Sequence, residues 1–208
     1  MLRSALVALD GSDYGESAAD LAIDWARRYG VRSLGLGIVD APTIQRAEPV
    51  PVGAGAYKKA RDEARLADAQ RRVADFLADF RARGHAAGVA VEVLEDIGDP
   101  PARILREAQR CDVVILGRET HFHFETQEQP DETLARVLRG SPRPVVVVPR
   151  SVPEGQGILL AYGGGREAAR TLQTFQLLGL AAGEAIEVVT IHRDGARPRR
   201  WSTWRGST

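Results

Sequence analysis

Two runs made only of aliphatic residues constrain the fold of this chain most. They are Val113–Leu116 and Val145–Val148, followed by glycine and proline respectively. Strands that are buried on both faces read as continuous aliphatic runs, as they do in parallel sheets covered by helices. Along the rest of the chain, short β-branched runs alternate with longer amphipathic segments, which indicates crossover helices. The sequence therefore predicts an α/β fold built on a doubly wound parallel sheet.

Predicted strands and helices alternate up to about residue 150. The helix over Tyr57–Gly84 is the longest, and its apolar residues recur at helical spacing, so we assign this stripe to the core. The segment Ala41–Ala56 carries three prolines and two glycines and is predicted to be a long loop. The predicted strands are Ala5–Leu9, Ser33–Ile38, Ala90–Glu95, Val113–Leu116 and Pro144–Val148, and the other predicted helices are Tyr14–Tyr29, Pro100–Gln109 and Asp131–Leu138.

A break rich in proline and glycine separates these elements from a shorter copy of the pattern. We expect a first domain over 1–150, a linker over 151–156, an incomplete second repeat over 157–192 and a disordered basic tail over 193–208. One strand–helix–strand unit cannot bury both faces of its sheet, so the repeat docks on the first domain, pairs across a dimer or is the remnant of a longer chain. Its predicted elements are Ile158–Tyr162, Arg166–Leu180 and Ala185–Ile191.

Composition limits the partners and the compartment. The chain has 28 basic and 28 acidic residues, so no net charge favours nucleic acid or a membrane. Its single cysteine, Cys111, excludes an internal disulfide and fits a reducing compartment, where we expect a buried, inert thiol. No signal peptide is visible, and no apolar stretch approaches the ~20 residues that cross a bilayer. These features predict a cytoplasmic protein without a membrane partner.

The ordered motifs of the first domain resemble those of the universal stress protein family, over about Leu2 to Arg150. The resemblance implies a five-stranded parallel sheet in a doubly wound sandwich of the adenine nucleotide alpha-hydrolase type, with the second repeat opening a tandem domain. It also implies a homodimer through the last strand, and a division into members that bind ATP and members that do not. The motifs are Asp10-Gly11-Ser12 after the first strand, Gly35–Pro42, Gly98–Pro101, Cys111–Gly117 and Val137–Pro149.

The phosphate motif of the ATP-binding members is degenerate in this chain. Those members have Gly, two residues, Gly, nine residues and then Gly-Ser or Gly-Thr after the fourth strand, which offers backbone N–H groups to phosphates. Here Gly117 matches the first glycine, Thr120 replaces the second, and Pro130-Asp131 or Asp131-Glu132 replaces the last pair. Together with Glu119, Glu125 and Glu128, these acids would repel a triphosphate unless a bridging Mg²⁺ made the interaction attractive.

The adenosine half of the site is better preserved. The resemblance implies that Asp10 accepts a hydrogen bond from a ribose hydroxyl or the base, and that Val39 and its neighbours line the base. ATP, AMP or adenosine are the ligands to consider, with no cofactor assigned firmly. In the alternative interpretation, Asp10 caps the first helix or its turn. The candidate binding residues are Asp10, Gly11, Ser12, Val39 and Gly117.

Two other groups of residues suggest ligands. His121 and His123 lie two residues apart with carboxylates on each side, and an extended chain would point both imidazoles to one face, as a transition-metal site requires. With no third histidine nearby, an exposed loop is the alternative. The tail interleaves arginines with Trp201 and Trp204, which could stack on bases, but so short a patch favours disorder over nucleic-acid binding.

The sequence thus favours a non-catalytic stress-response sensor or interaction module. No catalytic residue is assigned, since no serine or histidine follows a nucleophile pattern. The expected assembly is a homodimer through Val145–Val148, with a protein partner of unknown identity. Two alternatives remain open, an ATP-binding protein with slow hydrolysis and a metal-responsive module built on His121 and His123.

Overall fold

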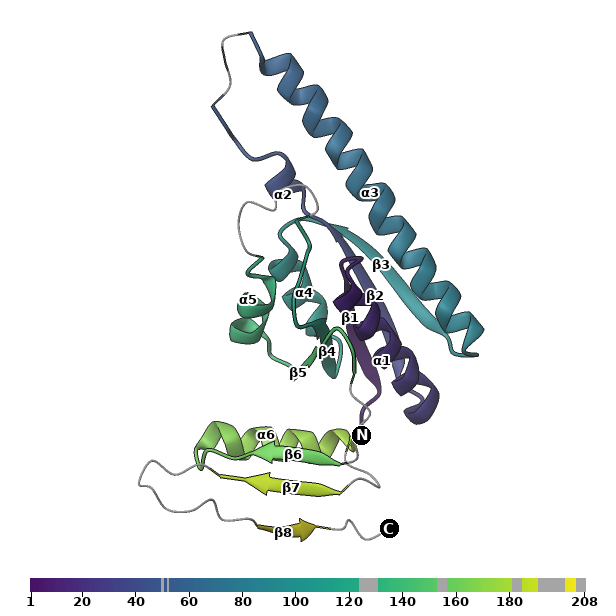
Figure 1. The fold of residues 1–208 in the computed structure, drawn as a ribbon, viewed down its shortest axis with the longest axis vertical. Helices are drawn as coiled ribbons and strands as arrows, with labels where there is room; N and C mark the ends of the chain where they lie inside the picture. Colours follow the sequence, from purple (N-terminus) through teal and green to yellow (C-terminus); the bar gives the residue numbers. More distant parts are fainter. Residues whose placement is uncertain are drawn as a thin grey trace. The chain divides into compact units, whose positions relative to one another are not determined.

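A five-stranded parallel sheet with the order β3-β2-β1-β4-β5 lies at the centre of the first of two structural units, Arg3–Val152 (Figure 1). The computed structural model describes residues 1–49, 51, 53–123, 131–152, 157–180, 185–190 and 201–204. The order reverses between β1 and β4, so the sheet is doubly wound and the predicted fold class is confirmed. The strands are β1 (Ser4–Leu9), β2 (Arg32–Val39), β3 (Val91–Ile97), β4 (Val113–Gly117) and β5 (Val145–Val148).

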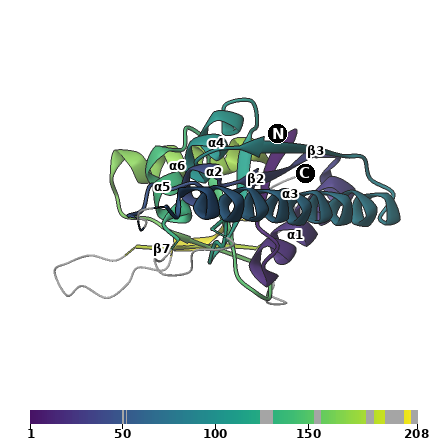
Figure 2. The same ribbon diagram turned by 90° about the horizontal axis from the view of Figure 1, so that it is seen from above.

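Helices cover both faces of this sheet. α1 and α3 lie on one face and α4 on the other, together with α5, which packs against α4 (Figure 2). Ala5–Leu9 and Val113–Leu116 are buried between these layers, as their aliphatic sequences predict, whereas β5 is an edge strand on which Val147 is 38% exposed. The helices are α1 (Asp13–Tyr29), α2 (Ala41–Ile44), α3 (Gly55–Ala86), α4 (Pro100–Ala108) and α5 (Thr133–Gly140).

The long helix α3 lies unusually close to β2. A Cβ atom added at Gly37 would come within 2.6 Å of the Val73 side chain, and one at Gly35 within 2.7 Å of the Phe80 ring. The 32 residues of α3 span about 48 Å at 1.5 Å per residue, which is far longer than the strands. Its amino-terminal part therefore extends past the carboxyl ends of the strands, where Figure 1 shows it next to α2.

Two boundaries differ from the sequence prediction. The expectation of a continuous loop over Ala41–Ala56 is wrong for Ala41–Ile44, which form α2, because the Asp40 carboxylate caps this turn by accepting from the Thr43 N–H at 3.1 Å. Proline in the first turn of a helix is compatible with that start. Helix α5 begins at Thr133 and not at Asp131, because the Asp131 carboxylate accepts from the Thr133 N–H at 2.8 Å, ahead of the helix.

The second unit comprises Met1–Leu2 and Pro153–Thr208 and contains a smaller three-stranded sheet. Its parallel strands β6 (Ile158–Ala161) and β7 (Ile186–Val189), joined through α6 (Arg166–Leu178), match the predicted strand–helix–strand order. The prediction of a disordered tail is wrong at β8 (Trp201–Trp204), which pairs antiparallel with β7. Tryptophan and threonine favour strands, and this pairing satisfies the backbone of β7 on its second side. The remaining tail residues lie outside the described ranges.

Candidate functional site

Asp10, at the carboxyl end of β1, is bonded to the protein through both of its oxygens. It is 4% exposed, and its Oδ1 accepts from the Ser12 N–H at 3.1 Å and from the Ser12 hydroxyl at 2.7 Å. Its Oδ2 accepts from the backbone N–H of His121 at 2.7 Å. The carboxylate therefore joins the turn after β1 to the chain that follows β4, across the point where the strand order reverses.

Gly11 and Ser12 complete that turn. The Ser12 side chain caps α1, accepting from the Gly15 N–H at 3.1 Å. Gly11 has φ +71°, and a Cβ there would lie 2.1 Å from the ring of Phe76 on α3. Asp10 thus holds the turn in which Ser12 caps α1. This agrees with the alternative interpretation of the sequence, in which Asp10 caps the first helix or its turn.

Val39 and Gly117, the other predicted binding residues, contact neighbouring protein groups. Val39 is fully buried at the end of β2, and its carbonyl accepts from the Gly98 N–H at 3.0 Å. Gly117 ends β4, and a Cβ there would lie 2.7 Å from the Cβ of Tyr14 on α1. The close packing of β4 on α1 is thus enough to explain the glycine.

The chain after β4 is held against the ends of β1 and β4 by a hydrogen bond and by core packing. Thr120 is 5% exposed, and its hydroxyl is buried without a partner among the described residues. Phe122 is fully buried and belongs to one core cluster with Leu6, Leu36 and Val137. The ring therefore fixes residues 120–122 against the sheet in the region where the sequence predicted a phosphate loop. Phe124, Glu125, Glu128 and Pro130 lie outside the described residues.

Asp131 anchors the same segment from the α5 side. Its Oδ2 accepts from the Phe122 N–H at 2.9 Å, while its Oδ1 accepts from the Thr133 N–H. A carboxylate thus occupies the start of the helix, where the ATP-binding pattern would have a glycine and a hydroxyl residue. Asp131 satisfies N–H groups that would otherwise be available to an anion.

His123 lies between two carboxylates. Its Nδ1 is hydrogen-bonded to the buried Asp40, and its Nε2 lies 3.7 Å from Asp131 Oδ1. The hydrogen bond with Asp40 raises the pKa of His123, opposed by partial burial and supported by the charges of Asp131 and Asp99. The imidazole at this position links the end of β2 to the segment after β4.

His121 does not join His123. Its side chain is exposed, and its backbone N–H is the group bonded to Asp10. Within the described ranges, no group of three or more histidine, cysteine, aspartate or glutamate side chains is arranged to hold a metal ion. Cys111 is buried, and burial raises the pKa of its thiol, as expected of an inert cysteine.

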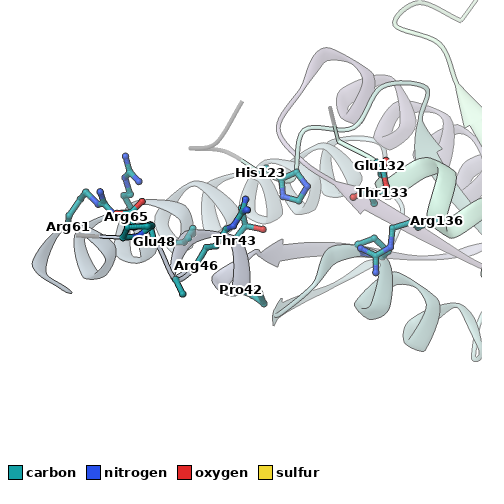
Figure 3. A pocket seen from close by; sticks show the side chains of 14 residues that line it. Pro42, Thr43, Arg46, Glu48, Arg61, Arg65, His123, Glu132, Thr133 and Arg136 are labelled. Carbon is teal, nitrogen blue, oxygen red and sulfur yellow. The ribbon is translucent and has the colours of Figure 1, made fainter. Parts of the chain in front are cut away.

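A cavity of about 770 Å³ lies beside the closed crevice, between the α2–α3 segment and the starts of α4 and α5 (Figure 3). Its apolar wall is formed by Pro42, Ile44, Pro49 and Pro101. This cavity is not evident from the sequence because its residues are scattered over five segments, although the spacing of Arg61 and Arg65 places both on one helix face. Its charged and hydroxyl lining consists of Arg46, Arg61, Arg65, Arg136, His123, Glu48, Glu132, Thr43 and Thr133.

The arginines of this cavity differ in their partners. Arg136 makes a two-pronged bond to Asp99, with both N–O distances 2.9 Å, and Arg61 pairs with Glu48 and Asp62. Asp99 raises the pKa of Arg136. Arg46 and Arg65, in contrast, have no ion-pair partner among the residues that the structure describes.

Comparison with known proteins agrees with the fold and the motifs. A sequence model described as the universal stress protein family matches residues 1–149. No curated protein matches the chain. No helix in the described part of the chain is long and apolar enough to cross a membrane.

Solved structures share the fold at low identity. A universal stress protein from Archaeoglobus fulgidus DSM 4304 has a TM-score of 0.67 at 16% identity, covering 92% of this chain and 68% of its own. The hypothetical protein MJ0577, the subject of a structure-based assignment of biochemical function, has a TM-score of 0.53 at 17% identity, covering 74% of this chain and 99% of its own. A universal stress protein family member from Burkholderia pseudomallei has a TM-score of 0.52 at 21% identity, covering 71% and 96%.

Proposed function

The chain belongs to the universal stress protein family, and from this premise we propose that it is a non-catalytic sensor or interaction module in a stress response. In this proposal its sheet crevice binds adenosine or nucleotides at most weakly. One observation carries the proposal: both oxygens of Asp10 are bonded to the protein, one of them to the backbone of the segment after β4.

An adenosine in this crevice would have to compete with bonds that already exist. To bond a ribose hydroxyl, Asp10 would share or lose its contact with the His121 N–H or with Ser12. Hydrogen bonds to a charged group contribute about 1.5–3 kcal/mol each, so exchanging one for another gains little. Displacing residues 120–122 would in addition expose the buried Phe122 ring.

A triphosphate is disfavoured further by the start of α5. Asp131 already accepts from two backbone N–H groups there, and Glu132 adds a second carboxylate. Slow ATP hydrolysis, the first alternative, requires these groups to give way to phosphates or to share a bridging Mg²⁺. The metal-responsive alternative requires His123 to leave Asp40 and to turn toward the exposed His121.

The proposed assembly is a homodimer through β5, with a protein partner of unknown identity. β5 is an edge strand of the sheet, and Val147 is 38% exposed on it. Unpaired apolar edges need a cover, and pairing with a second copy supplies one. We also propose the division into a domain over 1–150, a linker over 151–156, a second repeat over 157–192 and a tail over 193–208.

Adenosine and ATP test this proposal separately. We expect isothermal titration to detect adenosine binding no tighter than the millimolar range, and phosphate release from ATP with Mg²⁺ to equal the protein-free rate. Micromolar adenosine binding that is lost in Asp10→Asn would overturn the closed crevice. Phosphate release that follows protein concentration through size-exclusion fractions would overturn the absence of catalysis. Native mass spectrometry of the purified protein should show no copurified nucleotide.

A further inference from the structure

We infer that the cavity beside the crevice binds a small organic phosphomonoester, with its phosphate at Arg46 and Arg65. The inference rests on the proposed function in one respect, since a sensor whose crevice is closed needs another ligand site. The cavity volume, about 770 Å³, falls within the roughly 300–1,000 Å³ of small-molecule sites. It is therefore large enough for a phosphorylated metabolite and too large for a phosphate ion alone.

The charges of the lining select an anion. Four arginines and His123 face two carboxylates, Glu48 and Glu132. Glu48 is bonded to Arg61, so it does not neutralise the two unpaired arginines. Arginine binds phosphate oxygens through parallel N–H donors. Two guanidinium groups balance the double negative charge of a phosphomonoester, whereas a carboxylate ligand carries one negative charge and would balance only one of them.

The two ends of the cavity are not equivalent. Figure 3 shows Arg61, Arg65 and Glu48 on one side, Glu132, Thr133 and Arg136 on the other, and His123 between them. Asp99, which is bonded to Arg136, and to a lesser extent Glu132 already supply negative charge near Arg136 and raise its pKa. The phosphate is therefore placed away from Arg136, between Arg65 and Arg46, the second of which Figure 3 shows next to Thr43.

A buried polar group at the far end also lacks a partner. Thr133 lines the cavity, is 1% exposed, and its hydroxyl has no hydrogen-bond partner among the described residues. Its hydroxyl is covered by protein atoms, as is the equally unpartnered hydroxyl of Thr120 outside the cavity, so the arginines, and not Thr133, point to the ligand. The prolines and Ile44 supply the apolar wall that would cover the body of that ligand.

The test compares phosphomonoesters with their parent alcohols on the full chain. We expect glucose 6-phosphate or glycerol 3-phosphate to bind at least tenfold more tightly than glucose or glycerol in isothermal titration. The double variant Arg46→Gln/Arg65→Gln should weaken phosphomonoester binding by about tenfold for each arginine. A matched control, Arg28→Gln/Arg71→Gln, removes the same charge from exposed arginines outside the cavity and should bind as the unmodified protein does.

Three results would overturn the inference. They are equal binding of phosphate esters and alcohols, equal weakening by the two double variants, and protection from hydrogen exchange at β1 and α1 instead of α2 and the start of α3. The last result would place the ligand in the crevice and overturn the proposed function as well. If only the first or second result is obtained, the inference fails but the closed crevice stands, because adenosine carries no phosphate and tests that site independently.

Discussion

The closed crevice and the arginine cavity lie side by side at the carboxyl edge of one sheet, yet their polar groups are used in opposite ways. In the crevice, Asp10 and Asp131 together accept five hydrogen bonds from the protein, and the Phe122 ring is fully buried. The Thr120 hydroxyl in the crevice and the Thr133 hydroxyl at the cavity both lack a partner among the described residues, so the contrast depends on the arginines. The Arg46 and Arg65 side chains have no ion-pair partner in the described part of the chain. A preserved motif therefore marks the family, whereas unpaired arginines mark where an anion could still bind.

Phe122→Ala should have the largest effect, because it removes the ring that holds the crevice closed. Truncating a fully buried phenylalanine costs about 3–5 kcal/mol of unfolding free energy. Urea unfolding followed by circular dichroism measures it. Tyr57→Ala, at a residue that is 75% exposed, is the control and should stay within about 0.5 kcal/mol. A loss below about 1 kcal/mol for Phe122→Ala would mean that core packing does not close the crevice.

Gly11→Ala should have the next largest effect on the unfolding free energy. The new methyl group would meet the Phe76 ring, and φ +71° is itself unfavourable for alanine. We expect a loss of about 2–4 kcal/mol, of which 1–2 come from the backbone conformation. Gly30→Ala isolates that backbone contribution, because Gly30 has φ +67° and a Cβ there meets nothing within 4 Å. Equal thermal shifts for the two variants would show that Phe76 gives way and that the turn after β1 is loosely packed.

Stability should depend on pH through His123. The folded-state pKa of His123 is raised, chiefly by the hydrogen bond with Asp40, so its contribution is fully present below the unfolded pKa of about 6.5. This contribution is lost as the pH rises through the folded-state value. Asp40, Asp131 and Asp99 are the acids that act on the ring, with Arg136 bonded to Asp99.

His123→Gln isolates this effect from other titrations. The difference in unfolding free energy between the unmodified protein and His123→Gln should shrink steadily from pH 5.5 to pH 9. His121→Gln is the control, because the His121 side chain is exposed and forms no hydrogen bond or ion pair with those acids in the described part of the structure. A difference that stays constant across this range would mean that the imidazole is neutral between its carboxylates and does not hold the segment by charge.

The fold was predictable because its signals are local. Each buried strand carries its own aliphatic run, as in Val113–Leu116, and each crossover helix its own apolar stripe. The short helix α2 was missed because prolines dominate the pattern there, while the Asp40 cap that starts it leaves only a single-residue signal. The strand Trp201–Trp204 was missed because its partner, β7, decides whether so short a segment pairs.

The site was predictable only in part, for a related reason. The sequence located Asp10, Gly11, Ser12 and Gly117 at the correct edge and left open whether Asp10 binds a ligand or caps a turn. The second contact of Asp10, with the His121 N–H, joins residues 111 apart in the chain and could not be read from the sequence. The arginine cavity depends on the same kind of distant pairing. Arg136 is bonded to Asp99, whereas Arg65 has no ion-pair partner among the residues that the structure describes, and the sequence does not distinguish the two.

Arg65→Gln and Arg136→Gln should have the smallest effects on stability, and the contrast between them is the sharpest test of which arginines are available. Arg136 is half exposed and makes two bonds of 2.9 Å to Asp99, so its loss should cost about 0.3–1 kcal/mol after solvent screening. Arg65 has no such partner among the described residues, so Arg65→Gln should change the unfolding free energy by less than about 0.5 kcal/mol, in either direction. Thermal unfolding at low and high salt separates the two, because only the Arg136→Gln difference should shrink as salt screens the pair. A stability loss for Arg65→Gln as large as that for Arg136→Gln would mean that Arg65 stabilises the fold, and that the cavity and the crevice are alike after all.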